Sequence, residues 1–182
     1  MSRKYKILDQ TKLYFISFAV VNWIDLFIRN EYRNILLDSL MFCQKKKGLE
    51  VFAWCIMTSH MHLIIGTQGN PMEDILRDFK SFTSRNLRIA IEENSTESRK
   101  EWLVKMMYEV GLTNRNNRGF QLWQQHNHPI ELATNEMIVQ RLQYIHFNPV
   151  KAGFVSDPED YLYSSARDYA GEPGLVKIIL LD

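Results

Sequence analysis

The chain has 182 residues, of which 46% are hydrophobic, and its formal net charge is +1. This length can bury a sizeable core, so we expect residues 1–182 to form a single domain with a basic arm at 1–12 and a tail at 157–182. No run approaches the roughly 20 apolar residues of a membrane span, and the small net charge excludes a uniformly basic, histone-like protein.

The first half of the chain predicts a strand, a helix and a pair of strands. These elements are expected at 13–23, from Glu31 to Lys47, at 49–57 and at 60–67. Asn30 is a residue type that caps helices, and Gly48 is one that ends them. Thr58 and Ser59 leave a tight connection between the last two strands, which therefore should pair antiparallel.

The second half predicts mainly helices, and residues 120–123 are consistent with a fourth strand. The helices are expected from Pro71 to about Asn94, near 97–111, and from Asn135 to Asn148. The last should end there because proline disfavours helical geometry at the residue before it. The order of elements predicts an α+β fold, in which an antiparallel sheet carries helices on one face in a ferredoxin-like (split βαβ) arrangement.

Two cysteines, Cys43 and Cys55, lie in separate predicted elements and lack metal-binding spacing. We expect both to be reduced thiols in the core, as in a cytoplasmic protein. The apolar residues at 13–24 are not followed by a small-residue cleavage pattern, so no signal peptide is expected.

A histidine pair, His60 and His62, occupies alternate positions of a predicted strand. Both imidazoles then point to one face, as a shared metal ion would require. Taken alone, the pair is more often two partly exposed histidines on a polar face. His126 and His128 have the same spacing, but they lie in a polar stretch where no common face is imposed.

A second pattern places Gln140, Tyr144 and Asn148 on one face of the last predicted helix. Asn148 could offer an oxygen ligand to a metal, and Tyr144 could attack an electrophile held there. Alone, the pattern also fits a helix end followed by proline. His146, two residues after Tyr144, should face away and is not expected to be a ligand.

Two further groups have alternative interpretations. The aromatic segment around Tyr161, Tyr163 and Tyr169 could contact DNA, but is more typical of a tail that docks by its tyrosines. Basic residues suited to DNA phosphates could equally form a solvated surface. These are Arg77, Lys80, Arg85, Arg88, Arg115, Arg118 and Lys151.

The motifs together resemble those of the small single-tyrosine HUH transposases. They are Ser-His-Met-His-Leu-Ile-Ile at 59–65, Tyr-Ile-His-Phe-Asn-Pro-Val-Lys-Ala-Gly-Phe-Val at 144–155, and Tyr-Leu-Tyr-Ser-Ser-Ala at 161–166. They are most similar to the REP-associated tyrosine transposase-like branch, and the likeness spans roughly residues 10–170.

The resemblance implies a metal-dependent enzyme that cuts and rejoins single-stranded DNA beside a hairpin. His60, His62 and Asn148 would hold Mg²⁺ or Mn²⁺, and Tyr144 would form a 5′-phosphotyrosine. Some relatives have Gln where this chain has Asn148, which is shorter by one methylene. Family members include homodimers that share tyrosines as well as monomers.

Two other functions are compatible with the same residues. The histidine pair could serve a metallohydrolase that activates water, in which Tyr144 would be dispensable. Alternatively, the fold could be a non-catalytic, domesticated protein that binds single strands or hairpins.

Overall fold

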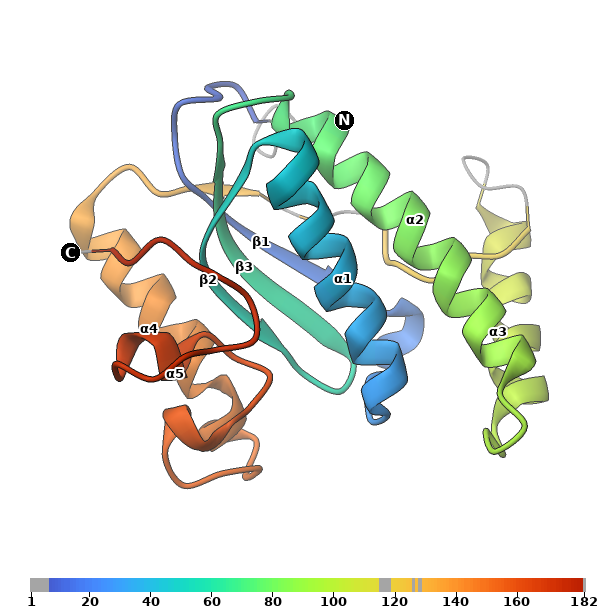
Figure 1. The fold of residues 1–182 in the computed structure, drawn as a ribbon. Coiled ribbons are helices and arrows are strands. Elements are labelled where there is room, and N and C mark those ends of the chain that lie inside the picture. Colours follow the sequence, from blue (N-terminus) through green and yellow to red (C-terminus); the bar gives the residue numbers. More distant parts are fainter. Residues whose placement is uncertain (1–6, 115–118, 126, 128, 182) are drawn as a thin grey trace.

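A computed structural model describes residues 7–114, 119–125, 127 and 129–181 (Figure 1). Its elements are β1 (Tyr14–Ala19), the 3₁₀ turn η2 (Val21–Trp23), α1 (Asn30–Lys47), β2 (Leu49–Ile56), β3 (His60–Thr67), α2 (Met72–Glu93), α3 (Lys100–Thr113), β4 (Ile130–Glu131), α4 (Asn135–Lys151), η3 (Pro158–Asp160) and α5 (Ala166–Tyr169).

The four strands form one sheet in the order β2-β3-β1-β4, and every neighbouring pair is antiparallel. β1 and β2 therefore run parallel with β3 between them, which is the split βαβ arrangement. The predicted fold class is confirmed. The β2–β3 pair is also confirmed as an antiparallel hairpin.

The predicted fourth strand at 120–123 is wrong. β4 lies at Ile130–Glu131 instead, paired with Tyr14 and Phe15. Of the predicted segment, Trp123 makes one isolated bridge with Val20. Its indole is buried in the core and its Nε1 donates to Thr83 Oγ1 at 3.0 Å. The segment thus crosses the end of β1. Burial of the indole there stabilises the fold more than a further paired strand would.

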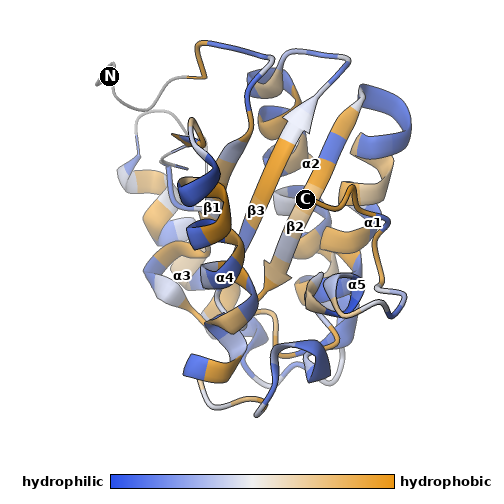
Figure 2. Ribbon diagram, turned by 90° about the vertical axis from the view of Figure 1, so that its left-hand side faces the viewer, coloured by the Kyte–Doolittle hydropathy of each residue, from blue (hydrophilic) through white to orange (hydrophobic). Residues whose placement is uncertain are grey.

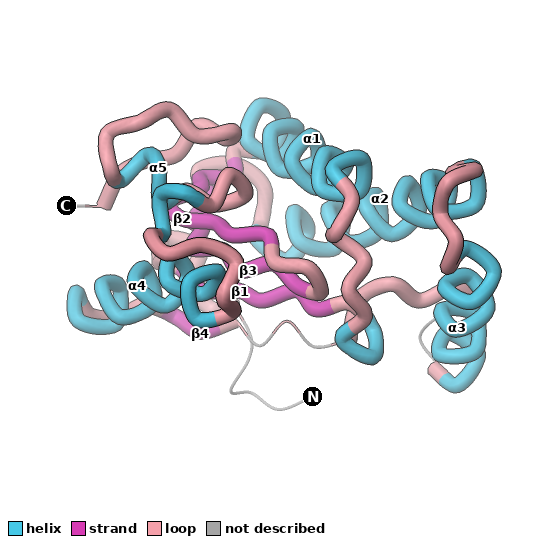
Figure 3. Tube along the Cα trace, turned by 90° about the horizontal axis from the view of Figure 1, so that it is seen from below, coloured by secondary structure: helices cyan, strands magenta, loops and turns pink. Residues whose placement is uncertain are grey.

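Helices cover both faces of the sheet, whereas the sequence predicted one. α1 and α2 pack on one face and α4 lies on the other (Figures 1 and 3). Almost every residue of β2 and β3 is consequently buried, and these strands are hydrophobic along most of their length (Figure 2). Near-continuous apolar strands are expected where both faces of a sheet are covered.

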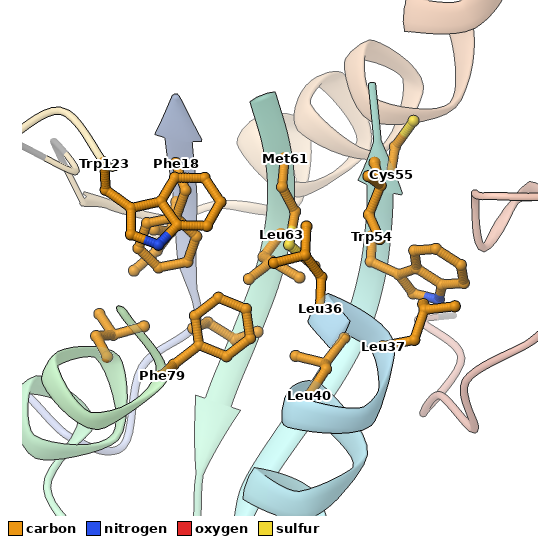
Figure 4. Packing of buried hydrophobic residues seen from close by; sticks show 14 of the residues in the cluster. Phe18, Leu36, Leu37, Leu40, Trp54, Cys55, Met61, Leu63, Phe79 and Trp123 are labelled. Atoms are coloured by element: carbon orange, nitrogen blue, oxygen red, sulfur yellow. The ribbon is translucent and has the colours of Figure 1, made fainter. Parts of the chain in front are cut away.

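The face toward α1 and α2 forms the main hydrocarbon core. Met61 and Leu63 of β3 point toward Leu36 and Leu40 of α1 and Phe79 of α2 (Figure 4). All five side chains are buried. Burial of each such side chain contributes about 1.5–3 kcal/mol, so this face supplies much of the folding free energy.

The C-terminal ends of α1 and α4 can be compared with the ends predicted from Gly48 and Pro149. α1 ends as predicted at Gly48, whose φ of 72° is left-handed. α4 does not end at Asn148 but continues through Pro149 to Lys151. A proline costs one backbone hydrogen bond and disfavours, without forbidding, a helical residue before it. Asn148 therefore lies inside the helix, one full turn after Tyr144.

The segment from 157 to 181 docks on the exposed edge of β2. Tyr161 Oη donates to Ile56 O and Tyr169 Oη donates to Phe52 O, each at 3.0 Å. Backbone hydrogen bonds from Ser165 N to Trp54 O and from Ile179 N to Val51 O extend this contact. Docking by tyrosines is confirmed, and the segment protects an edge that could otherwise pair with another chain.

Both cysteines are free and buried, as predicted. Burial raises the pKa of Cys43 to about 11 and raises the pKa of Cys55 further. Both thiols therefore stay protonated and unreactive at neutral pH. Among the helices in the described part of the chain, none is long and apolar enough to cross a membrane.

Candidate functional site

The histidine pair lies at the start of β3, on the face of the sheet toward α4. His60 and His62 are alternate residues, and their ring centroids are 4.7 Å apart with planes inclined by 68°. The sequence prediction that both rings share one face is confirmed. The competing residues His126 and His128 lie outside the described residues.

A serine orients each imidazole through its Nδ1 atom. Ser17 lies opposite His62 in the β1–β3 register, and its Oγ is 2.7 Å from His62 Nδ1. Ser59 Oγ is 3.1 Å from His60 Nδ1. Hydrogen bonds at Nδ1 leave Nε2 of each ring as the atom that can bind another partner.

Burial keeps both imidazoles neutral at pH 7. Desolvation lowers the pKa of His60 below its ordinary value. It lowers the pKa of His62 to about 3, with smaller effects from the neighbouring charges of His60 and Arg141. The Nε2 atom of His62 is buried and has no hydrogen-bond partner among the described residues. Two neutral imidazoles whose Nδ1 atoms are engaged by serines are a donor set that fits a divalent metal ion.

Tyr144 reaches the pair from α4. Its ring centroid is 5.1 Å from that of His62, and 37% of its surface is exposed. Phe15 of β1 lies beneath both, stacked on His62 at 5.4 Å and edge-to-face with Tyr144 at 5.9 Å. The fold therefore brings together the two motifs that the sequence holds far apart.

The remaining predicted residues of α4 divide between its two sides. Asn148 is half-buried one turn after Tyr144, and Lys151 Nζ is 6.0 Å from the Tyr144 ring centroid. His146 faces away, with its Nε2 3.0 Å from Ser165 Oγ. Burial lowers the pKa of His146 to about 4. The prediction that His146 faces away from Tyr144 is confirmed, and the structure adds that His146 contacts the C-terminal segment.

Two residues beside the site were missed by the sequence analysis. Arg141 places its guanidinium carbon 4.9 Å from the Phe15 ring centroid, close enough to affect His62. Its spacing of three residues from Tyr144 on a helix could have revealed it. Trp23 lies 5.4 Å from His60 between ring centroids. It was placed at the end of a strand, and no local pattern pointed to it.

Two predicted DNA-binding cations of α2 are engaged within the fold. Arg77 forms ion pairs with Asp74 at 2.5 Å and Asp78 at 3.2 Å. Lys80 Nζ donates to Gln124 O and to Asn127 Oδ1, each at 2.9 Å, and burial lowers its pKa to about 8. α2 also packs on the other face of the sheet from the histidine pair, so neither cation joins the site.

Among the other predicted cations, the two on α2 are also separate from the site. Arg88 Nη1 donates to Tyr108 Oη at 3.0 Å, on the side of α2 that meets α3. Arg85 is exposed on α2. Arg115 and Arg118 lie outside the described residues. Lys151 is therefore the one predicted DNA-binding cation that the described structure places beside Tyr144.

Comparisons with known proteins agree with the fold. Residues 19–120 match the protein family described as "Transposase IS200 like", a span that contains both histidines but ends before Tyr144. No curated protein matches the chain.

Two solved structures are similar to the chain. One is a REP-associated tyrosine transposase bound to a REP hairpin, with 17% identity, a TM-score of 0.66, and coverage of 98% of this chain and 92% of that one. The other is a proposed transposase from Deinococcus radiodurans R1, with 18% identity, a TM-score of 0.43, and coverage of 79% and 95%. The first supports the fold across α4 and the C-terminal segment, beyond the family match.

Proposed function

The chain belongs to the IS200-like transposase family, and from that premise we propose that it cleaves and rejoins single-stranded DNA with Tyr144 as the nucleophile. One observation carries the proposal. Tyr144 lies outside the family-matched span, yet its ring is 5.1 Å from His62. A tyrosine with 37% of its surface exposed, next to a neutral imidazole, is an arrangement suited to attack on a phosphodiester.

We propose that His60 and His62 hold Mg²⁺ or Mn²⁺ through their Nε2 atoms, with the amide oxygen of Asn148 as a third ligand. The support is the donor set itself. Both Nδ1 atoms are engaged by serines, and Nε2 of His62 is buried without a partner in the described chain. Imidazole ligands suit Mn²⁺ better than Mg²⁺. When bound, the cation would withdraw charge from a phosphate oxygen and make the phosphorus more electrophilic.

The residues of the chain would then act in sequence. Arg141 and Lys151 flank Tyr144 and attract the anionic phosphate. Tyr144 Oη attacks the phosphorus and its proton passes to solvent. The P–O3′ bond breaks, and the departing 3′-oxygen gains a proton to become a hydroxyl. The 5′-phosphotyrosine conserves the phosphodiester bond, so attack by a 3′-hydroxyl can later rejoin strands without ATP.

The arrangement supports action by one chain on its own. The support is that the histidine pair and Tyr144 meet within a single molecule. The hairpin beside the cleavage site belongs to the same proposal, because the similar solved structure is bound to a REP hairpin. A homodimer remains a prediction of the resemblance alone.

The test is covalent capture of DNA. Wild-type protein is incubated with hairpin-flanked single-stranded DNA and Mn²⁺, and the products are separated on a denaturing gel. We expect a protein–DNA adduct that Tyr144→Phe abolishes and Tyr108→Phe retains, since Tyr108 lies on α3 away from the site.

The two alternative functions predict different products on the denaturing gel. Cleavage that persists in Tyr144→Phe would indicate a metallohydrolase that uses water. Binding without cleavage under any divalent metal would indicate a non-catalytic DNA-binding protein.

A further inference from the structure

The indole of Trp23 is an exposed aromatic surface at the edge of the site. Its ring meets that of His60 edge-to-face, with centroids 5.4 Å apart and planes inclined by 74°. Such a contact uses an edge of one ring, and 59% of the Trp23 surface remains exposed. A large flat apolar surface therefore stays available beside one of the predicted metal ligands.

The backbone holds this indole in place against local preference. Asn22 and Trp23 have φ values of 56° and 54°. These values lie in the left-handed region of backbone conformation, which residues other than glycine rarely adopt. Hydrogen bonds from Val21 N to Leu122 O at 2.8 Å and from Trp23 N to Val20 O at 3.0 Å fix the turn. Strain of this kind persists where surrounding contacts impose it, and it is concentrated at functional sites.

The indole also continues a row of rings that leads to the nucleophile. Successive centroids from Trp23 through His60 and His62 to Tyr144 are 5.4, 4.7 and 5.1 Å apart. Arg141 lies beyond, over the Phe15 ring that supports Tyr144. A strand whose phosphate lies at the histidines could thus place its neighbouring base on Trp23, while Arg141 meets the backbone on the other side.

We propose that Trp23 stacks an unpaired nucleobase of the DNA strand, at a nucleotide next to the phosphate that Tyr144 attacks. The position assigned to this base rests on the proposed function. Every base has a flat face, so the subsite tolerates sequence while requiring that the base be free of a duplex stack. It therefore makes the site selective for single strands.

Equilibrium binding tests the subsite without any need for cleavage. In the Tyr144→Phe background and without metal, fluorescence anisotropy measures the dissociation constant of a hairpin-flanked single strand. Trp23→Asn removes the ring and keeps a residue that tolerates the left-handed backbone. We expect it to weaken binding roughly 5- to 150-fold, and Trp23→Phe to retain most of the affinity. Phe154→Ala, which removes an aromatic ring with 49% exposure near Tyr161, should have no effect.

A strand with abasic nucleotides at the positions flanking the cleavage site completes the test. The wild type should bind this abasic strand more weakly than the intact strand. Trp23→Asn should bind the abasic strand no more weakly than the wild type does. If Trp23→Asn weakens binding of intact and abasic strands equally, or of neither, the subsite is overturned. A protein that forms no covalent adduct yet shows the base-dependent loss would disprove the proposed chemistry and keep the subsite.

Discussion

The two faces of β3 differ in what their side chains do. Toward α1 and α2, Met61 and Leu63 are buried among hydrocarbon side chains. Toward α4, His60 and His62 meet hydroxyls, aromatic rings and the cation of Arg141. The two sets alternate along one strand, so residues that stabilise the fold and residues suited to chemistry are immediate neighbours.

The polar face of β3 lowers the stability of the protein, whereas the apolar face raises it. A buried polar atom without a partner, such as Nε2 of His62 in the described structure, destabilises a protein by about 1–3 kcal/mol. The face toward α4 therefore tolerates a loss of stability that the opposite hydrocarbon face offsets. Substitutions on the two faces should separate activity from stability.

The largest expected effect is the loss of activity on replacing His62. Removal of one imidazole from a metal site that stabilises transition-state charge by several kcal/mol should lower adduct formation by about a thousandfold or more. In His62→Leu combined with Ser17→Ala, the unpartnered Nε2 and the serine hydroxyl disappear together. The double variant should consequently unfold in urea at the wild-type midpoint or higher. Clear destabilisation would show that the imidazole contributes to folding after all.

On the opposite face, Leu63→Ala should reverse this pattern. The variant leaves a cavity beneath α1, and we expect the free energy of unfolding to fall by about 2–5 kcal/mol. Adduct formation below the unfolding temperature should stay near the wild-type rate, since Leu63 points away from the histidines. Urea denaturation and single-turnover cleavage measure the two quantities. A loss of activity in a folded Leu63→Ala protein would contradict the division between faces.

The connection between α2 and α3 contains a buried carboxylate, Glu97. Glu97 is buried and forms ion pairs with Arg29 at 2.9 Å and Arg99 at 3.0 Å. The hydrogen bond from Arg99 contributes most to lowering the pKa of Glu97 from 4.5 to about 2. Because Glu97→Gln leaves two arginines without their carboxylate, it should lower the free energy of unfolding by about 3 kcal/mol at pH 7.

The pH dependence gives the sign of this contribution. A lowered pKa in the folded state stabilises the protein above about pH 4.5, and the contribution disappears as the pH falls toward about 2. The wild type should therefore lose stability over this interval more steeply than Glu97→Gln in urea titrations. Parallel curves would show that Glu97 does not contribute through its charge.

The smallest predicted effect concerns the orientation of a ligand. Ser17→Ala removes the hydroxyl 2.7 Å from His62 Nδ1. Loss of such a partner typically lowers metal affinity about 10- to 100-fold, so Mn²⁺ should bind more weakly by that factor in isothermal titration calorimetry. Ser81→Ala, exposed on α2, is the matched control. Equal affinities in both variants would mean that Ser17 does not position the imidazole.

Much of the local structure could be predicted from the sequence. Capping residues, turn residues and hydrophobic patterns located α1, α2, β2 and β3 to within a few residues, and Gly48 was correctly identified as the end of α1. The alternation of side chains along a strand was enough to place His60 and His62 on one face. These features depend on interactions between residues close in the chain, and sequence patterns record such interactions directly.

Other features were decided by contacts between distant segments. Ile130–Glu131 became the fourth strand because β1 offered it an edge, while Trp123 was buried instead. Lys80, predicted to bind DNA, instead donates to Gln124 and Asn127. Neither outcome leaves a local signal, because each depends on which partner is near after the chain has folded.

The candidate site combines features that the sequence determines with features that only the tertiary structure determines. The sequence alone determined that two imidazoles share a strand face and that Tyr144 and Asn148 share a helix face. The tertiary structure decided that α4 covers the histidine face, that Arg141 and Trp23 join the site, and that burial keeps both imidazoles neutral. Local periodicity determines the direction in which a side chain points. The environment it meets depends on how all apolar faces are buried together.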